Sequence, residues 1–142
     1  EAWVVLFDSW DVVDQVCDNL FAQSPLGYAK AVEWSSRPEE FVCRSGFTLM
    51  ACLAAHAKSL PDSAFEPFFT AIIARAGDER NFVKKAANWA LRNIGKRSLT
   101  LNARALEVAR QVEALPYRSA RWIARDAIRA LESEKIQARI RK

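Results

Sequence analysis

The sequence predicts an all-α protein, built as a right-handed solenoid of stacked helix pairs with a basic groove along its concave side. Apolar residues recur at intervals of three and four along most of the chain, as on one face of an α-helix. Strand signals are absent, since the sequence has no sustained alternation, no Asn-Gly turn and only 4 glycines. The long helices that open successive pairs begin roughly 40 residues apart, a spacing typical of HEAT-like repeats.

Proline and acidic residues mark where the predicted helices begin. Asp8 or Ser9 can cap the first helix, Pro38 precedes two glutamates, and Asp78 with Glu79 suits another first turn. We predict helices over residues 9–22, 27–36, 38–58, 63–76, 79–96, 99–115, 117–132 and 134–141.

The 142 residues suffice for one domain with a single core, so we expect residues 1–142 to form a single HEAT-like repeat domain. We expect this domain to be the C-terminal portion of a longer protein. In a solenoid of helix pairs, the same helix of each pair lines the concave wall. The residues to consider are therefore those on the helices that begin near 38, 79 and 117, on the side turned away from the core.

Charge is unevenly distributed along the chain. Residues 1–70 hold 4 Lys and Arg against 10 Asp and Glu, whereas residues 71–142 hold 17 against 7. A second half with a net charge of +10 predicts an anionic partner. No apolar run is long enough to span a bilayer, so we expect no membrane partner.

The three cysteines predict reduced, buried thiols and a cytoplasmic protein. Cys17, Cys43 and Cys52 are odd in number and lie within apolar runs, which does not suit a disulfide framework. Cys52 and His56 share a helix face and could form half of a metal site, but the sequence has no CxxC and no second histidine. His56 is better interpreted as a residue at the edge of the core, and we expect no metal.

The predicted 79–96 helix carries cations and aromatic rings opposite its apolar side. Trp89 lies away from the core arc, and its neighbours at helical spacing are Lys85, Arg92, Lys96 and Phe82. The core arc consists of Val83, Ala86, Ala87, Ala90, Leu91 and Ile94.

The predicted 117–132 helix repeats the arrangement. Trp122 faces away from the core with Arg118, Arg125 and Arg129 around it. One such tryptophan could simply pack against the adjacent repeat while the cations solvate the surface. Two on consecutive first helices favour a basic, aromatic-bearing groove that binds nucleic acid. The core arc consists of Ala120, Ile123, Ala124, Ala127, Ile128 and Leu131.

Arg44 projects from the 38–58 helix opposite its apolar stripe of Val42, Leu49 and Leu53, over a lane of small residues. It could form a salt bridge with Glu40 four residues before it, or it could contact a phosphate.

Asp14 has no such structural explanation. It shares a helix face with Trp10. Acids stabilise the helix dipole in the first turn, and Asp14 lies beyond that turn. Because a carboxylate repels DNA phosphates, an acid in a basic groove should have a chemical task.

These residues resemble the AlkD-like DNA alkylation repair glycosylases, a family with HEAT-like repeats. The similar stretches are SWDVVDQVCDNLF (9–21), EEFVCRSGFTLMACLA (39–54), DERNFVKKAANWALRNIGKR (78–97) and ARWIARDAIRALES (120–133). The resemblance implies Asp14 as the catalytic carboxylate, Trp10 and Trp89 as the active-site tryptophans, and Arg44 as a DNA contact. Family members also carry further N-terminal helices that this sequence does not contain.

The resemblance implies hydrolysis of the glycosidic bond of cationic N3- or N7-alkylated purines in double-stranded DNA. Asp14 would stabilise the positive charge that develops on the sugar and hold the attacking water. The resemblance implies no metal or organic cofactor, and we expect a monomer. The alternative is a non-catalytic HEAT-like module that binds DNA or an acidic protein. Phosphate contacts would come from Arg44, Lys85, Arg92, Lys96, Arg118 and Arg125, with Trp122 beside them.

Overall fold

The computed structural model describes residues 25–57 and 60–141, and this part of the chain is helical without strands. The prediction of an all-α protein is confirmed for these residues. The predicted 9–22 helix lies outside the described residues. In chain order the elements are α2 (Pro25–Ser35), α3 (Glu40–His56), a 3₁₀ turn η3 (Asp62–Phe65), α4 (Glu66–Arg75), α5 (Asn81–Gly95), α6 (Leu99–Glu113), α7 (Arg118–Leu131) and α8 (Glu134–Ile140).

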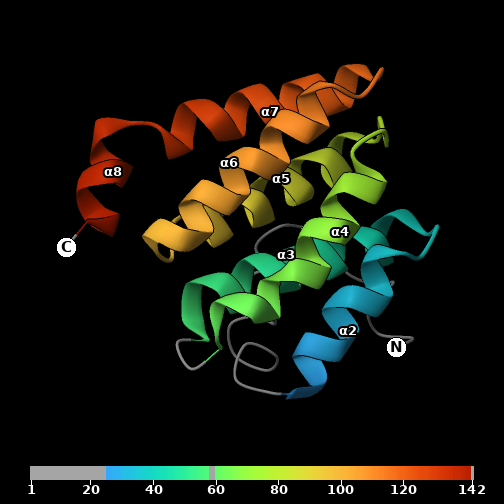
Figure 1. The fold of residues 1–142 in the computed structure, drawn as a ribbon. Coiled ribbons are helices and arrows are strands. Elements are labelled where there is room, and N and C mark those ends of the chain that lie inside the picture. The colour runs from blue at the N-terminus through green and yellow to red at the C-terminus, as the bar shows by residue number, and fades with distance from the viewer. Residues whose placement is uncertain (1–24, 58–59, 142) are drawn as a thin grey trace.

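The long helices form two layers. Helix α5 packs between α3 and α7 in one layer, while α4 packs between α2 and α6 in the other. Figure 1 shows this order, with α2 at one end of the stack and α7 and α8 at the other. Helices α3, α5 and α7 begin 41 and 37 residues apart, close to the predicted repeat.

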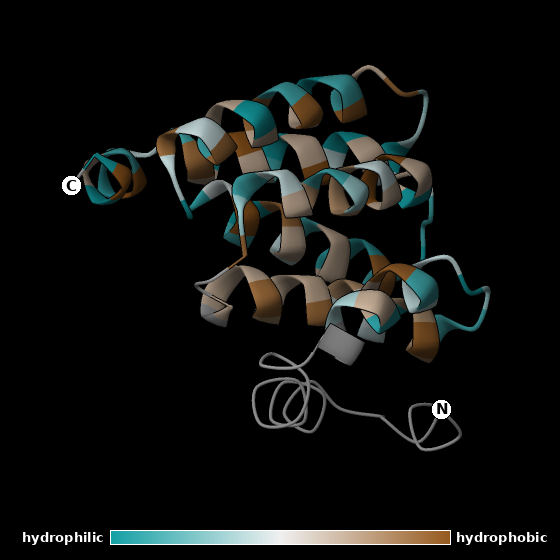
Figure 2. Ribbon diagram, turned by 60° about the horizontal axis from the view of Figure 1, so that its bottom comes forward, coloured by the Kyte–Doolittle hydropathy of each residue, from teal (hydrophilic) through white to brown (hydrophobic). Residues whose placement is uncertain are grey.

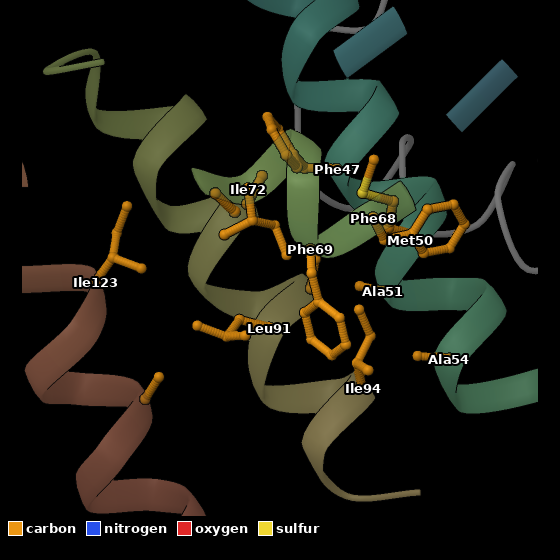
Figure 3. Packing of buried hydrophobic residues seen from close by; sticks show 14 of the residues in the cluster. Phe47, Met50, Ala51, Ala54, Phe68, Phe69, Ile72, Leu91, Ile94 and Ile123 are labelled. Carbon is orange, nitrogen blue, oxygen red and sulfur yellow. The ribbon is translucent and has the colours of Figure 1, made fainter. Parts of the chain in front are cut away.

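The core lies between the layers, where the apolar sides of the helices meet. Phe69 of α4 and Leu91 of α5 are buried together with Phe47 of α3, as Figure 3 shows. Hydrophobic and hydrophilic residues alternate along the helices (Figure 2), as expected where one side of each helix is buried. The predicted core arc of α5 is fully buried, and so is that of α7 except for Ile128, which is partly buried against the core.

Two arginines connect the segments that precede α3 and α5. Arg75 donates hydrogen bonds to the backbone oxygens of Ser35, Ser36 and Arg37, at 2.9–3.2 Å. Arg80 donates to the carbonyl of Pro38 at 2.8 Å and to the Asp78 carboxylate at 2.7 Å. This hydrogen bond from Arg80 is the main reason that the pKa of Asp78 lies below its ordinary value. The contacts fix the start of α3 relative to the start of α5.

Arg97, just after α5, performs a similar role at the other end of α3. Its guanidinium donates to the carbonyl oxygens of Ala54 and Leu60, at 2.9 and 3.0 Å, and lies over the ring of Phe65. Carbonyls in the last turn of a helix have no partner within the helix, so Arg97 satisfies one that α3 leaves open. Both ends of α3 are therefore held by arginines that flank α5, Arg80 before it and Arg97 after it.

Cys43 and Cys52 are buried thiols, which confirms the prediction for these two cysteines. Cys17 lies outside the described residues. The Cys43 thiol donates to the carbonyl of Ser35 at 3.2 Å. Burial raises the pKa of Cys43 from 9.0 to about 11, outweighing the nearby arginines.

We expect Cys43 to contribute an alkaline loss of stability. Between pH 9 and about 11 the folded protein retains the thiol proton while the unfolded chain releases it, so the free energy of unfolding falls as pH rises through this window. Urea unfolding at pH 8, 9 and 10 measures the slope, and Cys43→Ala should make it shallower. An identical slope in the variant would contradict the assignment.

No helix in the described part of the chain has the length and apolar character required to cross a bilayer.

Candidate nucleic-acid interface

Helix α7 presents arginines and one tryptophan on a single side. Arg118, Arg121, Trp122, Arg125 and Arg129 are all exposed, and at 100° per residue they fall within one outer arc. Trp122 is 39 % exposed, which confirms that it faces away from the core. The arc is opposite the buried alanines and isoleucine of the same helix.

The outer side of α5 continues this surface. Lys85 and Phe82 are exposed, and Arg92 and Lys96 are half-buried further along the helix. Two contacts join the outer sides of α5 and α7. The Lys84 ammonium lies 5.3 Å from the centre of the Trp122 ring, and Arg92 Nε lies 3.7 Å from the Asp126 carboxylate. We call these outer sides of α5 and α7 the cationic face.

Most cations of this face are not neutralised by carboxylates. Arg125 pairs with Glu113 at 3.3 Å, in addition to the Arg92 pair with Asp126. The remaining cations form no ion pair with any residue that the structure describes. These residues are Lys84, Lys85, Lys96, Arg118, Arg121 and Arg129.

The arginines of α6, in the other layer, are neutralised instead. Arg104 pairs with Glu66 at 3.0 Å and also with Glu107, and Arg110 pairs with Glu132 at 3.1 Å. Unpaired cations thus gather on one side of the domain. Like charges held together repel each other, so such a surface is typical of one that meets a polyanion.

The position of Trp122 agrees in part with each interpretation made from the sequence, packing against a neighbouring helix and exposure to a nucleic acid. Trp122 contacts the neighbouring helix α5, as the packing interpretation requires, but it does so through a cation–π contact with Lys84 rather than through burial. Its ring therefore stays available to a ligand. Lys84 was not among the predicted site residues, because its position on the helix wheel lies beside the outer arc and its partner belongs to another repeat.

Trp89 lies closer to the core than the sequence suggests. It is partly buried and packs against the hydrophobic core, whereas its neighbours Lys85 and Phe82 are exposed. Packing of this kind restricts the side-chain rotamers, so the indole is held in place before any ligand arrives.

Arg44 does not project into an open lane, and that expectation is wrong. Its side chain is only 1 % exposed, and the neighbouring Thr48 and Ala51 are buried as well. The guanidinium lies 5.0 Å from the centre of the Phe41 ring and 5.4 Å from that of Phe82. The two rings are themselves partly exposed, so they cover part of the guanidinium from the solvent side.

Trp10 and Asp14 lie outside the described residues, so their predicted roles stay predictions. Among the sites of the described chain, sequence reasoning also missed Arg121, whose exposed position on α7 follows from the same helical spacing as Arg118 and Arg125. Counting all cations of the outer arc, rather than those nearest to Trp122, would have found it.

An all-α scaffold with exposed aromatic rings among unpaired cations is typical of nucleic-acid-binding proteins. The family model for DNA alkylation repair enzymes matches residues 1–131, nearly the whole chain, and the chain belongs to this family. The match includes the cationic face and the three predicted catalytic positions, Asp14, Trp10 and Trp89. Membership implies an enzyme that takes part in DNA alkylation repair, with DNA as its partner. A search of curated proteins finds no match.

Proposed function

We propose that the protein is a DNA glycosylase that hydrolyses the glycosidic bond of cationic N3- or N7-alkylated purines in duplex DNA. The observation that carries the proposal is the cationic face, whose unpaired lysines and arginines lie within the part of the chain that the family model matches. A phosphate backbone is the ligand that such a surface suits.

The layered packing supports a solenoid as the framework of this site. Helices α3, α5 and α7 are the first helices of their pairs and lie side by side in one layer. In a right-handed HEAT-like solenoid this layer would form the concave wall, and its outward cations would form a basic groove. The DNA would then lie across α5 and α7, near Lys85, Arg92 and Arg118, with Trp122 beside it.

The proposed chemistry depends on charge. An alkylated purine is cationic and leaves as a neutral base, taking the electron pair of the glycosidic bond with it. Positive charge then develops on the deoxyribose, where the Asp14 carboxylate would stabilise it and accept a proton from the water that adds at C1′. The indoles of Trp10 and Trp89 would attract the cationic base and sugar through cation–π contacts of roughly 0.5–2 kcal/mol each.

The second candidate is a non-catalytic HEAT-like module that binds DNA or an acidic protein. The burial of Arg44 favours it, because an arginine held between Phe41 and Phe82 contributes to the fold as it stands. In a glycosylase the same arginine would have to become exposed before it could reach a phosphate.

Base release from methylated duplex DNA tests the two candidates. We expect the intact protein to release 7-methylguanine or 3-methyladenine faster than the spontaneous loss measured in buffer, and chromatography of the free bases provides the measurement. Unmethylated duplex should yield no base. Tight binding that weakens steeply with salt, combined with no release above the spontaneous rate, would replace the glycosylase with the non-catalytic module.

A further inference from the structure

A cavity of about 640 Å³ lies at the C-terminal end of α5, where α8 and the end of α3 meet it. Its lining includes Lys96 and Arg97 from the end of α5 and Arg139 from the last turn of α8. Asp62 is the one carboxylate among the described lining residues, and it accepts a hydrogen bond from Ser98 at 3.2 Å. The cavity is therefore rich in positive charge.

The cations of this cavity differ in what they already bind. Arg97 is committed to the carbonyl oxygens of Ala54 and Leu60. Lys96, Lys135 and Arg139 form no ion pair with any residue in the described part of the chain. Burial lowers the pKa of Lys96, and the positive charges of Arg92, Arg139 and Lys135 lower it further. The charged neighbours that lower the pKa of Lys96 are thus cations.

Helix dipoles explain only part of this arrangement. A cation at a helix C-terminus is favourable, which accounts for Lys96 at the end of α5 and for Arg139 at the end of α8. Lys135, in the first turn of α8, lies where the dipole disfavours a cation. The dipoles also do not explain why cations from two helices converge on one cavity, because their mutual repulsion opposes folding.

We infer that this cavity binds a phosphodiester group of the DNA backbone, with Lys96 and Arg139 as its ligands. Lys135 is near Lys96 but does not line the cavity. An anion in this position would relieve the repulsion between the three cations. The site extends the cationic face beyond α7, onto a helix that lies outside the 1–131 family match. The inference depends on the proposed DNA partner, but not on base excision.

Arg139→Gln tests the site, with Arg110→Gln as the matched control. Each removes one positive charge, but Arg110 is an exposed α6 residue already paired with Glu132. In fluorescence anisotropy with a lesion-free duplex, we expect Arg139→Gln to weaken binding by about three- to tenfold at low salt. The slope of log affinity against log salt should fall by about one, as for the loss of one phosphate contact. Arg139→Lys should restore most of the affinity.

Three results would overturn the inference. In the first, Arg139→Gln and Arg110→Gln weaken binding equally, as a general charge effect would. In the second, urea unfolding shows that Arg139→Gln loses stability together with affinity, which would give Arg139 a structural role. In the third, inorganic phosphate raises the melting temperature of the wild type but not that of Arg139→Gln, while the two proteins bind DNA with equal affinity. This result would assign the cavity to free phosphate. A wild type that binds duplex DNA as described but releases no base would refute the glycosylase and leave this site standing.

Discussion

Asp14→Asn should slow the release of alkylated purines by about 100-fold or more, a loss comparable to the removal of one group that stabilises transition-state charge elsewhere. The amide keeps the shape of the side chain but carries no charge, so it cannot balance the positive charge that develops on the sugar. Single-turnover release from methylated duplex, with protein in excess, measures this step without a contribution from product release.

The affinity of Asp14→Asn for DNA should not fall with the release rate. A carboxylate within a cationic site repels the phosphates around it, so its removal should leave the dissociation constant unchanged or lower it. Loss of rate with retained affinity separates a catalytic role from a binding role. A variant that lost both would indicate that Asp14 supports the fold or the DNA contact instead.

Asp11→Asn is the matched control, since it makes the same chemical change three residues away. We interpret Asp11 as a first-turn acid whose charge stabilises the helix dipole, an effect of at most about 1 kcal/mol on stability. Its release rate should stay close to that of the wild type. Equal rates for Asp14→Asn and wild type would remove Asp14 from the mechanism, and equal losses in the two aspartate variants would indicate a general effect of charge.

Helical periodicity predicted the helices well because it is a local property. The buried arc of α5 follows from spacing alone, and the structure contains every predicted helix from 27–36 onward. Helix boundaries that depend on distant residues do not follow from this periodicity. Helix α5 begins at Asn81 rather than 79, and one reason is distant in sequence, since Glu79 accepts a hydrogen bond from the backbone N–H of Ser119 in α7. The other reason, the contact between Asp78 and Arg80, is local.

In the site, too, features that depend on one helix could be predicted, whereas features that depend on contacts between helices could not. The exposure of Trp122 and its arginines could be predicted from one helix, since it depends only on which side that helix buries. The burial of Arg44 could not, because one of the rings that it contacts, Phe82, belongs to a different helix, α5. Lys96 was predicted from α5, but its cation neighbours on α8 lie about 40 residues further along the chain and meet it only in the folded protein.

Gly46→Ala should destabilise the protein by about 2–3 kcal/mol, although alanine is the better helix former. Helix propensity alone favours the alanine by about 1 kcal/mol in the middle of a helix. However, a Cβ at position 46 would lie 2.3 Å from the backbone nitrogen of Ser35 and 2.8 Å from the carbonyl oxygen of Ala31. These are backbone atoms of α2, which cannot move aside as a side chain can.

The clash must therefore be relieved by moving α2 away from α3. That movement would loosen the packing of Trp34 and Phe47, both buried in the core at this end of the stack. Overpacking of a tight core typically costs about 1–3 kcal/mol and occasionally more. The backbone contact places this site at or above the upper end of that range, so about 2–3 kcal/mol remain after the propensity gain is subtracted. Urea unfolding followed by far-UV circular dichroism gives the free energy of unfolding for each variant.

Gly95→Ala provides the comparison, because it makes the same substitution in the last turn of α5. A Cβ there would lie 2.7 Å from the methyl carbons of Leu131 and 3.1 Å from Cβ of Ala105. A leucine side chain can change rotamer, so we expect a loss of no more than about 1 kcal/mol. If Gly46→Ala were as stable as Gly95→Ala, helices α2 and α3 could not be in backbone contact at Gly46. If it is the less stable variant by the expected margin, the requirement for glycine at position 46 comes from that contact and not from any property of α3 alone.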